Sequence, residues 1–177
     1  MGDYTYRTID PDDAELAALL LFLPDFSGAF DSDSPQASIA SISACVSRGD
    51  TAAILALDSR REPAALFLVD LCRANGLAFG HQYVRRSWRG ESFAIVSGAV
   101  DYFMSQVWPD CRGLFGLVPD LPEFRMSRIA AAGAGGQRSG RLRGFFDIRG
   151  AQADAIVYQM RTPDRPDPKT AEGTPHR

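Results

Sequence analysis

The architecture of this chain follows from one stretch, Gly76-Leu-Ala-Phe-Gly-His-Gln-Tyr-Val-Arg-Arg-Ser-Trp-Arg-Gly-Glu-Ser-Phe93, and its continuation to Trp108. The apolar and aromatic residues up to Val84 predict a strand. From Phe93 onward, apolar side chains recur at steps of three and four, which predicts a helix. A short basic turn with one glycine joins the two. Because such a turn presents backbone N–H groups and the positive end of the helix dipole, it predicts a phosphate site.

Composition and charge are those of an ordinary globular chain. Hydrophobic residues make up 45% and charged residues 23% of the 177 positions, which suits one domain with a proper core. The formal net charge of −3 gives no general attraction to nucleic acids or membranes, so we expect neither as a partner. The longest apolar run, Leu16 to Leu23, is too short to cross a membrane, and no signal peptide is recognisable.

The cysteines favour a reducing environment. Cys45, Cys72 and Cys111 stand far apart in the sequence and show no metal-binding spacing. Their odd number argues against a disulfide framework. We therefore expect reduced thiols, no metal site and a cytoplasmic location.

Periodicity and turn residues predict strands and helices in the order β, α, α, β, β, β, α, β, α, β, β. The predicted strands cover residues 4–9, 51–58, 63–72, 77–84, 112–118, 141–148 and 153–161, and the predicted helices cover residues 11–23, 34–48, 93–108 and 123–132. Tight turns between the three strands of residues 51–84, one of them at Asn75-Gly76, predict an antiparallel meander. Because a helix connects the strands at 77–84 and 112–118, these two are expected to lie parallel.

Two segments lack a packing pattern. The run Gly133-Ala-Gly-Gly136 predicts a flexible end to the last helix. From Thr162 the chain is rich in proline and polar residues, which predicts disorder. We therefore expect one domain over residues 1–161 and a disordered Pro-rich tail over residues 162–177.

This element order, with the basic turn Tyr83-Val-Arg-Arg-Ser-Trp-Arg-Gly-Glu-Ser-Phe93, resembles the GNAT superfamily of N-acetyltransferases. It looks closest to the branch of ribosomal-protein N-terminal acetyltransferases and their phage-borne relatives. The resemblance covers about residues 4–161. It implies an α+β (α/β/α) fold with a mixed, mostly antiparallel sheet of about seven strands and four helices. The sheet would splay between its fourth and fifth strands, at Tyr83-Val84 and Leu117-Val118.

The basic turn is similar to the family's acetyl-CoA loop, written Gln/Arg-x-x-Gly-x-Gly/Ala, and departs from it at two positions. Ser87 stands where Gln or Arg is usual, and Ser92 replaces the second small Gly or Ala. Ser92 is still small, its hydroxyl can donate to phosphate, and it can also cap the helix that follows. A third departure is Phe124, where the family often has Asn three residues before a helical serine.

The resemblance implies direct transfer of an acetyl group from acetyl-CoA to a primary amine, either a small molecule or a protein N-terminus. A backbone N–H near Tyr83 or Val84 would then stabilise the oxyanion. Arg85 and Arg86 would pair with phosphate oxygens. The backbone N–H groups expected to hold the pyrophosphate belong to Arg89, Gly90, Glu91, Ser92 and Phe93.

His81 is the candidate general base. It precedes Val84 by three residues on the strand that would face the thioester, and the one other histidine, His176, lies in the tail. A histidine titrates near neutral pH and can accept the proton of the amine. Asp70 and Glu91 are alternative bases.

The proton for the leaving thiolate has two candidate donors. Ser127 would occupy the family's helical serine position near the sulfur of CoA, and Tyr158 on the last strand is the alternative. The acceptor would be chosen by residues 24–34, where Phe26, Phe30, Asp31 and Asp33 suggest a partly apolar mouth that attracts cations.

Two other interpretations remain open at this point. One is a GNAT-fold protein that has lost catalysis and binds CoA or a protein partner, which the departures in the turn favour. The other is an unrelated α+β binding module. A homodimer would also be in keeping with the resemblance.

Overall fold

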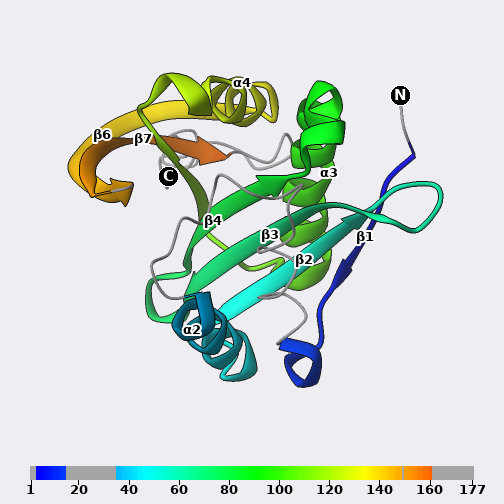
Figure 1. The fold of residues 1–177 in the computed structure, drawn as a ribbon. Helices are drawn as coiled ribbons and strands as arrows, with labels where there is room; N and C mark the ends of the chain where they lie inside the picture. The colour runs from blue at the N-terminus through cyan, green and yellow to red at the C-terminus, as the bar shows by residue number, and fades with distance from the viewer. Residues whose placement is uncertain (1–2, 15–34, 149, 161–177) are drawn as a thin grey trace, which may run out of the picture.

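A mixed seven-stranded sheet organises the molecule (Figure 1). The computed structural model describes residues 3–14, 35–148 and 150–160. The strands lie in the order β1-β2-β3-β4-β5-β7-β6, and β4 and β5 are the parallel pair among otherwise antiparallel neighbours. The predicted α+β class, the antiparallel meander and the parallel pair are all confirmed.

The strands have the following bounds: β1 Thr5–Thr8, β2 Thr51–Leu57, β3 Pro63–Cys72, β4 Leu77–Val84, β5 Gly113–Pro119, β6 Gly136–Ile148 and β7 Ala151–Met160. The helices are α2 Pro35–Ser47, α3 Ser92–Tyr102 and α4 Arg125–Gly133. Short 3-10 turns stand at η1 Pro11–Asp13, η3 Arg73–Asn75, η4 Arg86–Glu91 and η6 Pro122–Phe124, and a π-helical turn, η5, at Phe103–Val107.

The first predicted helix is seen at its start. Asp10 caps η1, since its carboxylate accepts a hydrogen bond from the Asp12 N–H at 3.1 Å, and Pro11 occupies the first position. The remainder of that helix, the acceptor loop at residues 24–34 and the tail at 162–177 lie outside the described residues. Within the described ranges, no helix has the length and apolar character needed to cross a bilayer.

The prediction of a flexible segment at 133–136 was wrong at its end, because β6 already begins at Gly136, opposite Met160 of β7. A Cβ at Gly136 would lie 2.9 Å from the Met160 sulfur, so this glycine permits close packing. Gly135 turns the chain with a φ of 81°. The final hairpin is therefore longer than the sequence indicated, and β7 begins at Ala151.

The prediction of one continuous helix over residues 93–108 was also wrong at its end. The α-helix stops at Tyr102, and the Trp108 N–H reaches back five residues to the Phe103 carbonyl at 2.9 Å. Phe103 is fully buried in this π-turn and packs edge-to-face on Trp108.

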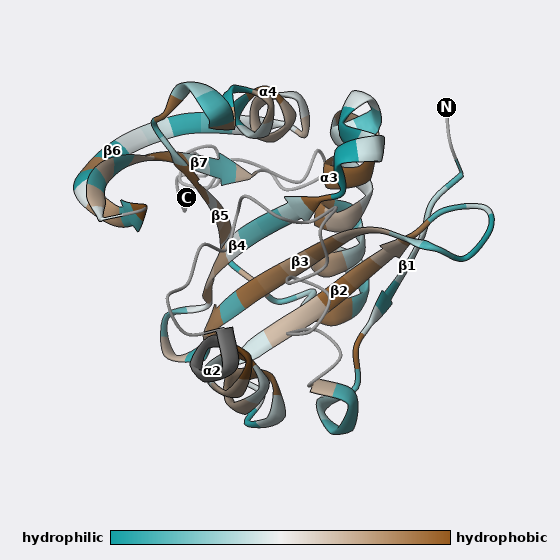
Figure 2. Cartoon of the chain, in the orientation of Figure 1, coloured by the Kyte–Doolittle hydropathy of each residue, from teal (hydrophilic) through white to brown (hydrophobic). Residues whose placement is uncertain are grey.

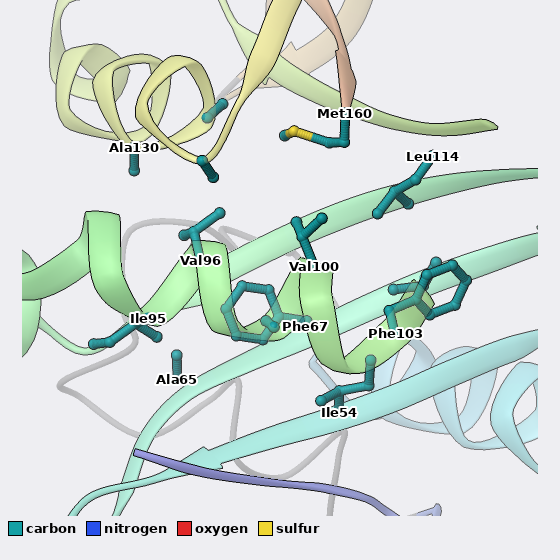
Figure 3. Close-up of a cluster of buried hydrophobic side chains, with 14 of the residues drawn as sticks. Ile54, Ala65, Phe67, Ile95, Val96, Val100, Phe103, Leu114, Ala130 and Met160 are labelled. Atoms are coloured by element: carbon teal, nitrogen blue, oxygen red, sulfur yellow. The ribbon is translucent and has the colours of Figure 1, made fainter. Parts of the chain in front are cut away.

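Two apolar clusters cover the two faces of the sheet. Because neighbouring strand residues point to opposite faces, Ile54 and Phe67 face α3 and α4, while Leu55 and Leu66 face α2. Figure 3 shows the larger cluster, in which Val96 and Val100 of α3 and Met160 of β7 approach the same centre. Strands β2 and β3 are covered on both sides, which explains their continuous apolar character in Figure 2.

Tyr6 fastens the edge strand β1 to α3. Its hydroxyl donates to the Ile95 carbonyl at 3.1 Å, and its ring stacks on Tyr102. Gly98 makes this approach possible, because a Cβ there would lie 2.6 and 2.7 Å from two atoms of the Tyr6 ring.

We predict that Gly98→Ala destabilises the protein. Alanine favours a helix over glycine by about 1 kcal/mol, but the added methyl must displace the Tyr6 ring, and overpacking typically costs about 1–3 kcal/mol. Urea unfolding should show a lower midpoint with an unchanged slope. Gly140→Ala is the control, since a Cβ there meets nothing within 4 Å. Equal or greater stability of Gly98→Ala would refute the close approach.

Candidate functional site

Strands β4 and β5 separate halfway along their length. Their parallel pairing runs from Leu77 opposite Gly113 to Gly80 opposite Gly116, although β4 continues to Val84 and β5 to Pro119. Beyond that point β4 stays paired with β3, and β5 stays paired with β7. The predicted splay between the fourth and fifth strands is therefore confirmed.

The separation exposes backbone N–H groups of β4 to the gap. The Arg85 N–H bonds the Ala64 carbonyl at 3.0 Å, and the β3–β4 register is regular. Because donors alternate in direction along an antiparallel ladder, the N–H groups of His81 and Tyr83 also turn toward β3. Those of Gln82 and Val84 consequently turn toward β5, where they have no partner strand. Val84, more than Tyr83, therefore fits the predicted oxyanion donor.

A cavity of about 40 Å³ lies at the separation. Gly80, His81 and Gln82 of β4 face Gly116, Leu117 and Val118 of β5 across it. Val96, Ala99 and Val100 of α3 supply an apolar floor. The cavity has room for about one to a few water molecules.

Helix α4 closes one side of the gap. The Gln82 side chain donates from Nε2 to the Ser127 carbonyl at 3.0 Å, so Ser127 lies beside β4 where β4 leaves β5. Arg128 fixes the start of α4, since its Nη1 donates to the carbonyl oxygens of Pro119 and Leu121 and lies 3.2 Å from the Asp120 carboxylate. The structure thus brings Ser127 to the site. That its hydroxyl protonates a thiolate stays a prediction.

The basic turn is a 3-10 helix that leads directly into α3. Arg86, Arg89 and Gly90 are exposed along it, and a Cβ at Gly90 would meet nothing within 4 Å. Arg85 is used within the fold, because its Nη1 donates to the Pro63 carbonyl at 3.0 Å. Arg86 and Arg89 are the exposed arginines of this turn, so an anion from solvent can reach them.

Ser92 does not cap the helix. The position before α3 is Glu91, which makes no side-chain cap bond, so that expectation was wrong. The Ser92 side chain is buried, and its hydroxyl donates to the Arg89 carbonyl at 2.8 Å. The Ser92 backbone N–H bonds the same carbonyl. Both donors are thus directed into the turn, so pyrophosphate binding by Ser92 requires this bond to open.

Phe93 joins the first turn of α3 to α4. Its ring packs against Gly133, where a Cβ would lie 2.8 Å from a ring atom, yet the side chain remains 51% exposed. Together with the exposed Met126 and Ile129 of α4 it gives this end of the helix pair an apolar surface.

His81 lies on the opposite face of the sheet, the face of α2, within a polar cluster. Its Nε2 lies 3.4 Å from Oδ2 of Asp70, and Thr51 donates to Oδ1 of Asp70 at 2.7 Å. The register explains the cluster: Leu68 lies opposite His81, and Thr51 lies opposite Asp70. Asp70 and His81 are therefore diagonal neighbours on one face.

The electrostatics of this cluster favour an ionised Asp70. The contact with the His81 imidazole is the main effect that lowers the pKa of Asp70. Burial raises this pKa, and the hydrogen bond from Thr51 lowers it. The net result is a pKa below its usual range. Burial, and then the nearby Asp70 carboxylate, raise the pKa of the Tyr83 phenol. Sequence analysis predicted Asp70 as an alternative base and predicted no role for Thr51.

The remaining candidates are placed as follows. Glu91 ends η4 at the start of α3, near Tyr4, whose phenol pKa is raised by burial and then by Glu91. Tyr158 is buried in the cluster under α3 and α4. Cys45, Cys72 and Cys111 are free thiols, and the described residues hold no gathering of three or more metal-binding side chains.

We predict that Asp70→Asn lowers stability in a pH-dependent way. Because the folded-state pKa of Asp70 is lowered from 3.8, its contribution is fully present above that value and is lost as the pH falls through the lower folded pKa. With the side chain 54% exposed, the effect should be small. Melting temperatures of wild type and variant should differ at about pH 7 and converge as the pH falls below 3.8. Asp50→Asn, which alters an exposed pair with Arg48, is the control. A difference that does not change with pH would contradict the assignment.

Comparison with known proteins shows what this geometry resembles. No protein-family model and no curated protein matches the chain. Among solved structures, a chimera of the spermidine N-acetyltransferase SpeG from Vibrio cholerae and hSSAT matches with a TM-score of 0.67 and 15% identity, over 89% of this chain and 94% of that one. The ribosomal-protein-S5-alanine acetyltransferase from Vibrio fischeri matches with a TM-score of 0.66 and 13% identity, over 94% of this chain and 100% of that one. The strand order, the parallel β4–β5 pair and these neighbours agree, and the chain has the fold of the GNAT acetyltransferases.

Proposed function

We propose that this protein is an N-acetyltransferase that passes the acetyl group of acetyl-CoA directly to a primary amine. The observation that carries the proposal is the separation of β4 and β5 beside an exposed basic turn. Similarity in fold to acetyltransferases supports it. At 13–15% identity the fold alone is shared, so the reaction has to be argued from the site.

In this proposal the pantetheine chain of acetyl-CoA would enter between the separated strands, which requires the small cavity there to widen. It can take the place of the missing strand pairing and accept hydrogen bonds from the N–H groups of Gln82 and Val84. A thioester carbonyl there develops negative charge on its oxygen during attack, and a fixed N–H stabilises that charge. Val96, Ala99 and Val100 of α3 would contact the apolar part of the pantetheine chain.

The phosphates of the cofactor would lie over the basic turn. Arg86 and Arg89 are exposed there, and Gly90 leaves the surface open. The dipole of α3, whose first residue follows the turn, adds attraction for an anion. The other residues predicted to bind the cofactor lie in or beside this turn: Tyr83, Arg85, Glu91, Ser92 and Phe93.

The amine would approach from the face of α2, where His81 lies. As the amine nitrogen bonds to the acetyl carbon, one of its protons passes to His81, and the C–S bond breaks to release the CoA thiolate. The thiolate takes up a proton, for which Ser127 beside β4 is the better placed donor, since Tyr158 is buried in the core. The products are an amide and free CoA.

The acceptor class follows from the chemistry, either a small amine or a protein N-terminus. The two solved neighbours are described by their names as acting on spermidine and on an alanine of a ribosomal protein, which are both amines. The polar face around Asp70 and His81 suits an ammonium group before it loses its proton.

A second candidate function is binding of CoA or a partner without transfer. It is favoured by Ser87, which replaces the usual Gln or Arg of the loop, and by Ser92, whose hydroxyl is engaged with the Arg89 carbonyl. Turnover separates the two functions.

We predict binding of acetyl-CoA at micromolar affinity, about −8 kcal/mol, by calorimetry. Dephospho-CoA is the control ligand. The double variant Arg86→Ala/Arg89→Ala should bind at least about 10-fold more weakly, which corresponds to about 1.4 kcal/mol. Arg112→Ala, at the opposite end of β4 and β5, is the matched control and should bind normally.

Release of free thiol in a screen of amines then decides between the two functions. Transfer to any amine supports the enzyme. Tight binding without transfer supports the CoA-binding alternative. Absence of binding up to millimolar acetyl-CoA would overturn both acetyl transfer and CoA binding, and would leave binding of a protein partner.

A further inference from the structure

On the face of the sheet toward α2, both oxygens of the Asp70 carboxylate are engaged by side chains of neighbouring strands. Thr51 donates to Oδ1 of Asp70 at 2.7 Å, and Oδ2 faces Nε2 of His81 at 3.4 Å. The three residues come from three neighbouring strands, β2, β3 and β4, whose registers are continuous at this point. The Asp70 carboxylate therefore links a residue of β2 with a residue of β4.

The surroundings give the three residues different exposure. Thr51 is buried, while the side chains of Asp70 and His81 remain 54% and 27% exposed. His81 also lines the cavity at the separation of β4 and β5. The cluster thus runs from a buried hydroxyl, through a carboxylate, to an imidazole carried by the strand that borders the gap.

Resting on the proposed acetyl transfer, we propose that Asp70 is a positioning residue. Held by Thr51, it orients His81 with Nε2–H toward the carboxylate and leaves Nδ1 to accept the proton of the acceptor amine.

The assignment of nitrogens follows from donor and acceptor chemistry. An ionised carboxylate accepts hydrogen bonds and cannot donate, so the imidazole nitrogen that faces it carries the hydrogen. A neutral imidazole has one N–H, so Nδ1 then presents a lone pair. The lowered pKa of Asp70 is consistent with an ionised carboxylate at neutral pH.

The transfer step balances with His81 as the acceptor. The amine nitrogen forms its bond to the acetyl carbon, the proton moves from that nitrogen to Nδ1, and the electron pair of the C–S bond leaves with sulfur. The imidazolium formed lies 3.4 Å from the Asp70 carboxylate, which stabilises its positive charge. His81 releases this proton to solvent before the next turnover, and the Ser127 oxygen, having protonated the thiolate, regains a proton from solvent.

A plain cross-strand contact with no role in transfer is the competing explanation. It predicts that removal of Asp70 affects stability alone. Orientation of His81 predicts in addition that the effect of removing Asp70 depends on the presence of His81.

The first test is spectroscopic and needs no acceptor. The chain has two histidines, so His176→Gln leaves His81 as the single imidazole in the NMR spectrum. In alkaline buffer we expect the Nε2–H tautomer, with a downfield N–H proton that exchanges slowly with water. Asp70→Asn and Thr51→Val should shift that proton or speed its exchange, while Thr51→Ser and the matched control Asp50→Asn should leave it in place. An Nδ1–H tautomer, or a signal that Asp70→Asn does not alter, would overturn the proposal.

The second test is a double-mutant cycle on the amine found by the screen. Asp70→Asn should lower kcat about 10-fold or more, with the KM for acetyl-CoA unchanged, because it impairs a general base that typically contributes about 10²–10⁴-fold. In a His81→Ala background, the same substitution should lower kcat by less than about 2-fold. Thr51→Ser should retain more activity than Thr51→Val.

The outcomes distinguish this inference from the proposed function. Equal losses from Asp70→Asn in both backgrounds would overturn the positioning role and leave acetyl transfer intact. Full turnover by His81→Ala would do the same. Failure of the wild type to transfer acetyl to any amine would remove the proposed function, and the NMR experiment would still show whether Asp70 orients His81.

Discussion

The structure depends on one interruption of a sheet, the end of β4–β5 pairing at Gly80 and Gly116. Beyond these two glycines, β4 and β5 no longer pair with each other. Strand β4 is held by β3 as far as Arg85, while β5 is held by β7 as far as Pro119 and by Arg128 at its exit. The interruption therefore arises from competition between neighbouring pairings. It leaves donors of β4 without a partner strand, which is costly unless water or a ligand accepts from them. A hydrogen-bonding ligand is what such a gap is suited to hold.

The side chains of β4 alternate between the two faces of the sheet. Gln82 and Val84 point to the side of α3 and α4, where Gln82 binds α4. His81 and Tyr83 point to the side of α2, where the Asp70 cluster lies. The backbone donors aim between these faces, into the gap itself. A cofactor lying in the gap would therefore present its acyl group where an amine can reach it from the side of α2. In the proposed mechanism, β4 would supply both the oxyanion donor and the base, because neighbouring residues of a strand face opposite ways.

The sequence predicted some of these features and missed others for physical reasons. Strands β3 and β4 were predicted at their observed bounds, because Pro63 and Asn75-Gly76 mark their ends clearly. The separation of β4 and β5 was expected through family resemblance, since it depends on pairings between distant strands that no local pattern records. Gly136 was predicted to lie in a flexible segment, but it begins β6, where its missing side chain allows close packing. A glycine in the sequence is compatible with either role. The contact between Asp70 and His81 depends on the register of β3 against β4. This register could have been predicted from the turn before Leu77, which places Asp70 opposite Phe79 and thus diagonal to His81. The hydrogen bond from the Ser92 hydroxyl to the Arg89 carbonyl forms because the turn is a 3-10 helix. One glycine in the turn does not predict that conformation.

The most direct measurement of the central claim is amide hydrogen exchange along β4, followed by NMR with and without acetyl-CoA. The account predicts that the N–H groups of Gln82 and Val84 become protected when the cofactor binds, while that of Tyr83, already turned toward β3, changes little. Binding of acetyl-CoA that leaves Gln82 and Val84 as exposed to exchange as before would contradict the account, because the ligand would then lie outside the gap between β4 and β5.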